Sequence, residues 1–182
     1  MSIASGAILE FLPQETILFE GARLRRETTI DLEPDAAFLG GDIVVFGRRA
    51  RGERFTSGFL REVWEVHREG RLVWGDALHL EDAIAAIIDD PACFDGAAAF
   101  ATMILAPAGR DPSTLVESAR VIQLAGAADG LRAGVTGVAG LVIARAGNLH
   151  FTHIRKPPPE RLQPRCNHRD QSFPPAVLEV LR

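Results

Sequence analysis

The residues best suited to binding a metal ion gather near the C-terminus of the chain. His150, His153, Cys166 and His168 carry imidazole and thiol groups, which are the usual ligands of zinc and nickel. Their spacing, HxxH followed by CxH, matches no established ligand pattern, and the segment around them is rich in proline. We therefore interpret these residues as part of a solvated tail and predict no metal ligands.

Carboxylates that could perform acid–base catalysis are present but are not arranged for it. Glu10, Glu15, Glu20 and Glu53 lie in the N-terminal half, and nothing in the sequence holds two of them at a fixed distance. The motifs GxGxxG, GxxxxGK[ST], HExxH and GxSxG are absent. We predict that the chain is not an enzyme. The alternative, a hydrolase using Glu15 or Glu53, would need a pocket in which two carboxylates converge.

Two polar stretches favour binding over catalysis. Residues 12–22 place polar side chains directly after Pro13 and between apolar runs, and residues 47–55 are densely charged and begin with glycine. In a structural interpretation the first stretch is a kink and the second a solvated connection. In a functional interpretation they form the rim of a protein-binding surface, where arginine is favoured over lysine. The candidate binding residues are Gln14, Glu15, Arg48, Gly52 and Glu53.

The composition is that of a folded protein without general affinity for polyanions. The chain has 182 residues, 47% of them hydrophobic and 24% charged, which excludes global disorder. A net charge of −4 argues against binding nucleic acid or an anionic membrane. No apolar run approaches the ~18 residues of a membrane-spanning helix and no basic segment follows Met1, so we expect a cytoplasmic protein. Cys93 and Cys166 lie far apart and predict no disulfide framework.

The composition changes near Gly147. Before this residue the basic side chains are all arginine, and Lys156 and the proline run at 157–159 lie beyond it. Proline runs favour extended conformations and interrupt helices and sheets. We predict a folded domain over residues 1–147 and a divergent, poorly ordered tail over residues 148–182.

Hydrophobic patterns divide the domain mainly into strands. The expected strands are residues 7–11, 16–19, 22–30, 37–46, 59–68, 71–80, 97–105, 131–136 and 140–146. Helical spacing predicts a helix over residues 81–90, and Asp111 followed by proline predicts the start of a second helix that ends before Gly126. Because strands outnumber helices and are separated by short turns, we predict a mainly-β fold of antiparallel strands and hairpins with two short helices.

Three stretches resemble one known family. They are LPQETILFEGARL at residues 12–24, FGRRARGERFTSG at residues 46–58 and RLVWGDALHL at residues 71–80. In order and spacing they are similar to the urease accessory protein UreD family, called UreH in some organisms. The resemblance extends from about Gly6 to about Ala146.

The resemblance implies a non-enzymatic β-scaffold that takes part in assembling the nickel centre of urease. Such proteins join the accessory protein UreF and the GTPase UreG, and the assembly docks on apo-urease. The absent P-loop agrees with GTP hydrolysis by UreG and not by this chain. No cofactor is expected to bind firmly; nickel is expected to be in transit and weakly held, because an ion must also leave. The five candidate residues would then contact a partner or line the passage of the ion.

The chain departs from the family at both ends. Family members are longer and carry a further segment before the first of the three stretches, and the resemblance stops where the composition changes. We expect a truncated gene model or a frameshift, which would leave sheet edges exposed. Two other interpretations stay open: a stand-alone β-scaffold that binds a small ligand or a protein, and a non-functional truncated copy of the accessory protein.

Overall fold

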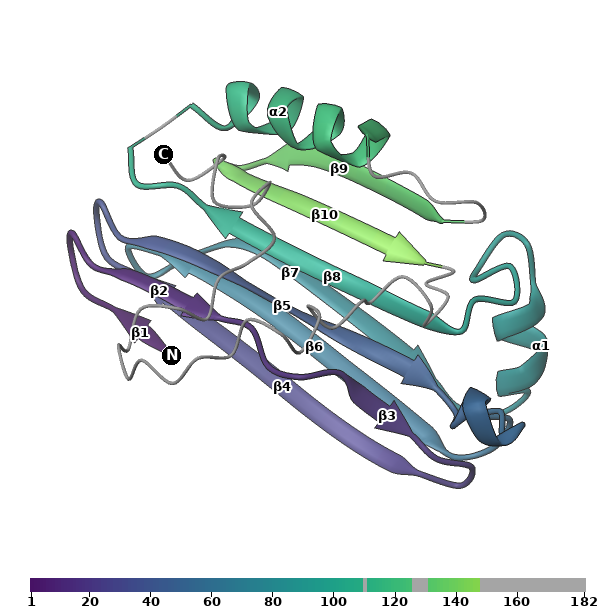
Figure 1. Ribbon diagram of the computed structural model, residues 1–182. Helices are drawn as coiled ribbons and strands as arrows, with labels where there is room; N and C mark the ends of the chain where they lie inside the picture. The colour runs from purple at the N-terminus through teal and green to yellow at the C-terminus, as the bar shows by residue number, and fades with distance from the viewer. Residues whose placement is uncertain (110, 126–130, 148–182) are drawn as a thin grey trace, which may run out of the picture.

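The computed structural model describes residues 1–109, 111–125 and 131–147, and in it two β-sheets pack face to face (Figure 1). The four-stranded sheet has the order β1 (Ser2–Ile3), β4 (Arg23–Leu32), β6 (Phe59–Arg68), β7 (Arg71–Leu80). The six-stranded sheet has the order β2 (Ile8–Phe11), β5 (Ala37–Phe46), β8 (Ala99–Ala106), β10 (Leu141–Gly147), β9 (Arg132–Val138). Its sixth strand, β3 (Thr16–Leu18), also pairs with β5. The tail predicted for residues 148–182 lies outside the described residues.

The strands pair in both directions. The pairs β6–β7, β5–β8, β8–β10 and β9–β10 are antiparallel, whereas β1–β4, β4–β6, β2–β5 and β3–β5 are parallel. The chain passes from β4 in one sheet to β5 in the other and back to β6, so β4 and β6 run in the same direction. The mainly-β class with two helices is confirmed. Short turns join neighbouring strands only at the hairpins β6–β7 and β9–β10 of the described chain, because the N-terminal strands alternate between the sheets.

Two α-helices complete the described fold. The helix α2 (Pro112–Ala125) lies over β9 and β10 and begins as predicted, because Asp111 Oδ1 accepts a hydrogen bond from the Ser113 N–H at 2.9 Å. That bond also lowers the pKa of the Asp111 carboxyl. The helix α1 (Ile84–Asp89) is shorter than predicted, because Asp82 and Ala83 have left-handed φ values of 51° and 46° that a helix cannot include. Within the described residues, neither helix has the length and apolar character needed to cross a membrane.

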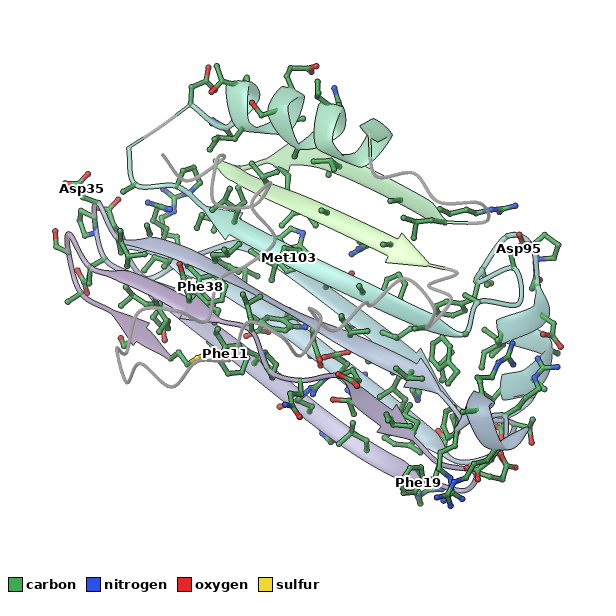
Figure 2. The ribbon with its side chains drawn as sticks, in the orientation of Figure 1. Phe11, Phe19, Asp35, Phe38, Asp95 and Met103 are labelled. Carbon is green, nitrogen blue, oxygen red and sulfur yellow. The ribbon has the colours of Figure 1, made fainter. Side chains whose placement is uncertain are left out.

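Three apolar clusters hold these elements together. The first lies between the sheets and includes Ile30, Phe38, Trp64, Val66 and Ile104. The second lies between the sheets near α1 and includes Phe46, Phe55, Leu60, Leu80 and Ile84. The third packs Leu115 and Val116 of α2 against Val142 on the outer face of the six-stranded sheet. Burying one large side chain such as Phe38, seen inside the sandwich in Figure 2, contributes about 1.5–3 kcal/mol.

Candidate functional site

The two polar stretches singled out in the sequence meet at one end of the sandwich. We call this junction the motif corner: residues 19–22, which connect β3 to β4, and residues 47–58, which connect β5 to β6. Glu20 joins the two connections. Its carboxylate accepts hydrogen bonds from the Thr56 N–H at 2.6 Å, the Thr56 hydroxyl at 2.7 Å and the Ser57 hydroxyl at 2.9 Å. Glu20 therefore closes the corner, a role that sequence analysis missed.

Arg48 and Glu53, two of the candidate binding residues, pair with each other in the motif corner. Arg48 Nε donates to Glu53 Oε2 at 2.8 Å, and the Glu20 N–H donates to Glu53 Oε1 at 2.9 Å. The Arg48 guanidinium also lies over the Phe19 ring, 4.5 Å from its centroid; Figure 2 labels Phe19 at this end of the molecule. Both residues thus hold the chain's own loops, while 39% of the Arg48 side chain is exposed to solvent and its contact with a partner stays a prediction.

Gly52 ends the short 3-10 helix η1 (Arg49–Arg51) inside the motif corner. Its φ of 74° is left-handed, and its N–H donates to the Arg49 carbonyl at 2.9 Å. Glycine adopts this conformation without the steric penalty that a side chain incurs. Turn geometry therefore explains Gly52, and its contact with a partner stays a prediction.

Gln14 and Glu15 lie apart from the corner, in the connection between β2 and β3. Both side chains are exposed, and Pro13, which has no N–H, separates the two short strands. The strand β3 lies between them and the motif corner. The structure therefore brings together the three candidates of the second stretch and leaves the two of the first stretch on a separate edge.

Hydrogen bonding keeps both carboxyl groups of the motif corner ionised. The bonds from the Thr56 main chain and side chain, followed by those from Ser57, lower the pKa of Glu20 from 4.5 to about 2. The Arg48 side chain and the Glu20 N–H lower the pKa of Glu53. A general acid needs a pKa near the working pH. The two carboxyl groups are neighbours, yet neither suits acid catalysis, which argues against a hydrolase based on Glu53.

Replacing Glu20 with glutamine is expected to remove part of the acid sensitivity of the fold. Because the pKa of Glu20 is lower in the folded chain, its stabilising effect is fully present above pH 4.5 and disappears as the pH falls toward 2. The free energy of unfolding of wild type should fall as the pH is lowered from 4.5 toward 2. Glu20→Gln should be less stable than wild type at pH 7, but its free energy of unfolding should fall less on acidification. Urea denaturation between pH 7 and pH 2.5 measures how the free energy of unfolding of each protein depends on pH. Glu15→Gln, which removes the same charge from an exposed side chain, is the control, and identical slopes for wild type and Glu20→Gln would contradict the prediction.

A second polar group lies between the two sheets, among the apolar clusters. We call Arg26, Asp42 and Glu62 the inter-sheet triad. Arg26 Nε on β4 donates to Glu62 Oε1 on β6 at 3.1 Å, and its Nη1 donates to Thr16 Oγ1 on β3 at 3.0 Å. Its Nη2 pairs with Asp42 on β5. One guanidinium therefore links four strands and both sheets.

Burial dominates the electrostatics of the inter-sheet triad. The Asp42 and Glu62 side chains are only 3% and 8% exposed. Burial raises the pKa of Glu62, while the Arg26 charge and a hydrogen bond with the Trp64 side chain act in the opposite direction. Buried carboxylates need such a partner, because an unpaired buried charge is costly. Arg26 is therefore the residue on which the triad depends.

The strand pattern contains a signal for the triad that sequence analysis did not use. Arg26 falls in the same period-two alternation as Leu24 and Ile30, whose side chains pack in the inter-sheet clusters. Glu62 likewise lies between two core residues of β6. A charged residue at an inward position of a strand indicates a buried polar contact, and both positions satisfy that condition.

A hollow of about 250 Å³ lies beside the end of β10 and the loop that follows α1. Its charged lining is already paired: Asp95, labelled in Figure 2, binds Arg132 at 2.7 Å, and Arg145 binds Asp76 at 2.6 Å. Among the residues that the structure describes, no three His, Cys, Asp or Glu side chains gather as a metal site. His150, His153, Cys166 and His168 lie outside those residues.

Comparison with known proteins gives one consistent result. The model of the UreD urease accessory protein family matches residues 1–156. Among curated relatives, a urease accessory protein UreD from Magnetococcus marinus is 47% identical over 120 residues, which cover 66% of this chain and 41% of the relative. Proteins of the same name from Methylobacterium sp. and Methylobacillus flagellatus are 44% and 38% identical, covering 76% and 79% of this chain and 49% and 48% of the relatives.

The chain spans about half, or less, of the length of these curated relatives. The matched region nevertheless contains both sheets, the motif corner and the inter-sheet triad. A family model that covers most of the chain, together with curated relatives that are 38–47% identical to it, establishes its ancestry. The chain belongs to the UreD family of urease accessory proteins.

Proposed function

We propose that this chain acts as a non-enzymatic scaffold in urease maturation and supports nickel insertion into apo-urease in a complex with UreF and the GTPase UreG. The observation that carries the proposal is the match of the UreD family model to residues 1–156. The ionised carboxyl groups of the motif corner support a structural role for that region. In this proposal nickel is the cargo, and GTP hydrolysis belongs to UreG.

The inter-sheet triad supports a polar route for the ion between the sheets. Asp42 and Glu62 offer carboxylate oxygens between the apolar clusters, and oxygen ligands hold nickel less firmly than thiolate or imidazole. Arg26 already pairs with both carboxylates, so an arriving cation must compete with the guanidinium. That competition suits weak binding, which transfer requires.

Co-expression of the chain with UreF, UreG and tagged apo-urease tests the proposed function. We expect the chain to be recovered with the tagged urease and urease activity to appear when nickel is supplied. Omitting the chain from the same expression is the control and should abolish both activity and nickel content. A folded chain that is never recovered with any of these proteins would contradict the proposal. That result would favour the stand-alone binding module, and an insoluble chain would favour the non-functional copy.

A further inference from the structure

Large apolar side chains are concentrated along one edge of the molecule. Among the described residues, four of the eight exposed large hydrophobic side chains lie between positions 8 and 19: Ile8, Leu12, Ile17 and Phe19. Ile8 is 75% exposed and Phe19 is 49% exposed, which is unusual for side chains of this size. Apolar side chains exposed in such number along one edge indicate an interaction site. We call these four residues, with Glu10 and Glu15, the edge strip.

Strand alternation directs the edge strip away from the core. On β2, Leu9 and Phe11 pack against the inter-sheet cluster, so Ile8 and Glu10 lie on the outer face of the six-stranded sheet. On β3, Leu18 is buried in the second cluster, so Ile17 lies on that same outer face. Figure 1 shows β2 and β3 along one margin of the sheet. Ile8 and Ile17 therefore belong to the surface of the six-stranded sheet and not to a loosely packed core.

The edge strip is poorly suited to pairing with an added strand. In the described chain β2 and β3 pair with β5 alone, and no strand of that part pairs with their other margin. Both are short, and Pro13 interrupts the row of main-chain donors between them. Short strands, proline and charge are the features that discourage edge-to-edge pairing. The apolar side chains exposed along this edge can therefore contact a partner through side-chain packing, without main-chain pairing.

Charge restricts what that partner can be. Residues 7–20 contain Glu10, Glu15 and Glu20 and no lysine or arginine. Glu20 is held inside the motif corner, which leaves Glu10 and Glu15 facing solvent beside the apolar side chains. A second copy of this edge, an anionic membrane or a nucleic acid would bring like charges together. A protein segment with arginine or lysine beside apolar side chains complements both features.

We propose that the edge strip is a docking surface for a basic, apolar segment of a partner protein. The inference rests on the proposed function, because that partner is sought among the proteins of the urease maturation complex. In this proposal Gln14 and Glu15 contact the partner, because they lie in the connection between β2 and β3 at the middle of the strip. Arg48, stacked on Phe19 at one end, limits the strip at the motif corner.

Two double variants test the strip in the co-expressed complex. Ile8→Ser with Ile17→Ser removes apolar contacts, and Glu10→Lys with Glu15→Lys reverses the charge. Each is expected to lower recovery of the chain with UreF, UreG and tagged apo-urease at least about tenfold, the loss that follows from removing interface anchors. Leu72→Ser is the matched control, because Leu72 is 58% exposed but lies on β7 of the other sheet. Circular dichroism and thermal unfolding confirm that all variants are folded.

A photoreactive benzoylphenylalanine at position 8 identifies the occupant. We expect a cross-link to a partner peptide in which arginine or lysine flanks apolar residues, and the yield should fall as salt is raised. Recovery of wild type together with equal recovery of both double variants would overturn the inference and leave the proposed function standing. A cross-link to a second copy of this chain or to an acidic peptide would overturn it as well. If wild type itself is not recovered, the proposed function fails and the inference fails with it.

Discussion

Replacing Arg26 with methionine is expected to lower the free energy of unfolding by about 3–5 kcal/mol, the cost of leaving buried charges without their partner. Methionine retains most of the length of the side chain but donates no hydrogen bond, so Asp42 and Glu62 lose the cation that joins them. Their side chains are 3% and 8% exposed, so water cannot replace the guanidinium. Urea denaturation at pH 7, followed by circular dichroism, measures the loss.

Arg25 provides the matched control for Arg26. It is the neighbouring residue on β4, but its side chain is 67% exposed and pairs with Glu27 at 2.7 Å on the surface. Arg25→Met is expected to cost less than about 1 kcal/mol, as for other exposed ion pairs. Equal losses for the two variants would show that the inter-sheet triad does not carry the stability assigned to it.

The pH dependence of Arg26→Met provides a second check. Burial already raises the pKa of Glu62 above 4.5, and loss of the Arg26 charge should raise that pKa further. A carboxyl group whose pKa is higher in the folded chain than in the unfolded chain destabilises the fold when the pH is above the folded-state pKa. This destabilisation disappears when the pH falls below the unfolded-state pKa. The stability difference between variant and wild type should therefore shrink as the pH is lowered from 7 to 5. A difference that grows on acidification would contradict this assignment.

Local patterns were sufficient to predict most elements. The hairpin β6–β7 has the predicted bounds, because Glu69 and Gly70 adopt the positive φ values, 51° and 74°, that a two-residue turn requires. The apolar run over residues 37–46 also predicted the bounds of β5 correctly. Each of these features depends on residues close together in the chain, where sequence and conformation are directly linked.

Strand partners could not be predicted in the same way. Period-two alternation shows which side chains share a face, but it does not say which strand lies alongside. The pair β4–β6 joins residues such as Arg23 and Phe59, and the intervening β5 belongs to the other sheet. Short turns favour antiparallel pairing of consecutive strands. Here the chain crosses to the other sheet between β4 and β6, and the two strands therefore pair in parallel.

The candidate site shows the same limit. Sequence analysis selected both polar stretches, and the structure joins them through Glu20, whose partners lie 36 and 37 positions away in the chain. Glu20 follows the apolar residues of β3 and resembles any exposed acid at the end of a strand. Arg26 lies in the strand predicted over residues 22–30, but its partners Asp42 and Glu62 come from two other strands. In both cases the hydrogen-bond partners lie on a distant part of the chain, so the pattern around the residue itself does not reveal them.

Replacing Gly47 with alanine is expected to destabilise the motif corner by about 3 kcal/mol or more, combining a left-handed backbone with overpacking. Gly47 has a φ of 89°, and an added Cβ would lie 2.5 Å from the Glu53 carbonyl oxygen and 2.6 Å from Arg54 Cα. Both obstacles are main-chain atoms of the same loop, so relief requires moving the loop. Urea denaturation measures the loss.

Gly52 separates the two contributions, because it has a similar φ of 74° but open space around the added Cβ. Gly52→Ala should therefore cost only the left-handed backbone penalty, about 1–2 kcal/mol. Equal effects at Gly47 and Gly52 would show that the loop yields to the clash and that the corner is less rigid than its hydrogen bonds imply. With a larger effect at Gly47, Gly52→Ala becomes a folded variant in which the predicted partner contact can be measured. A loss of urease recovery in that variant, beyond its small loss of stability, would assign Gly52 to an interface as well as to a turn.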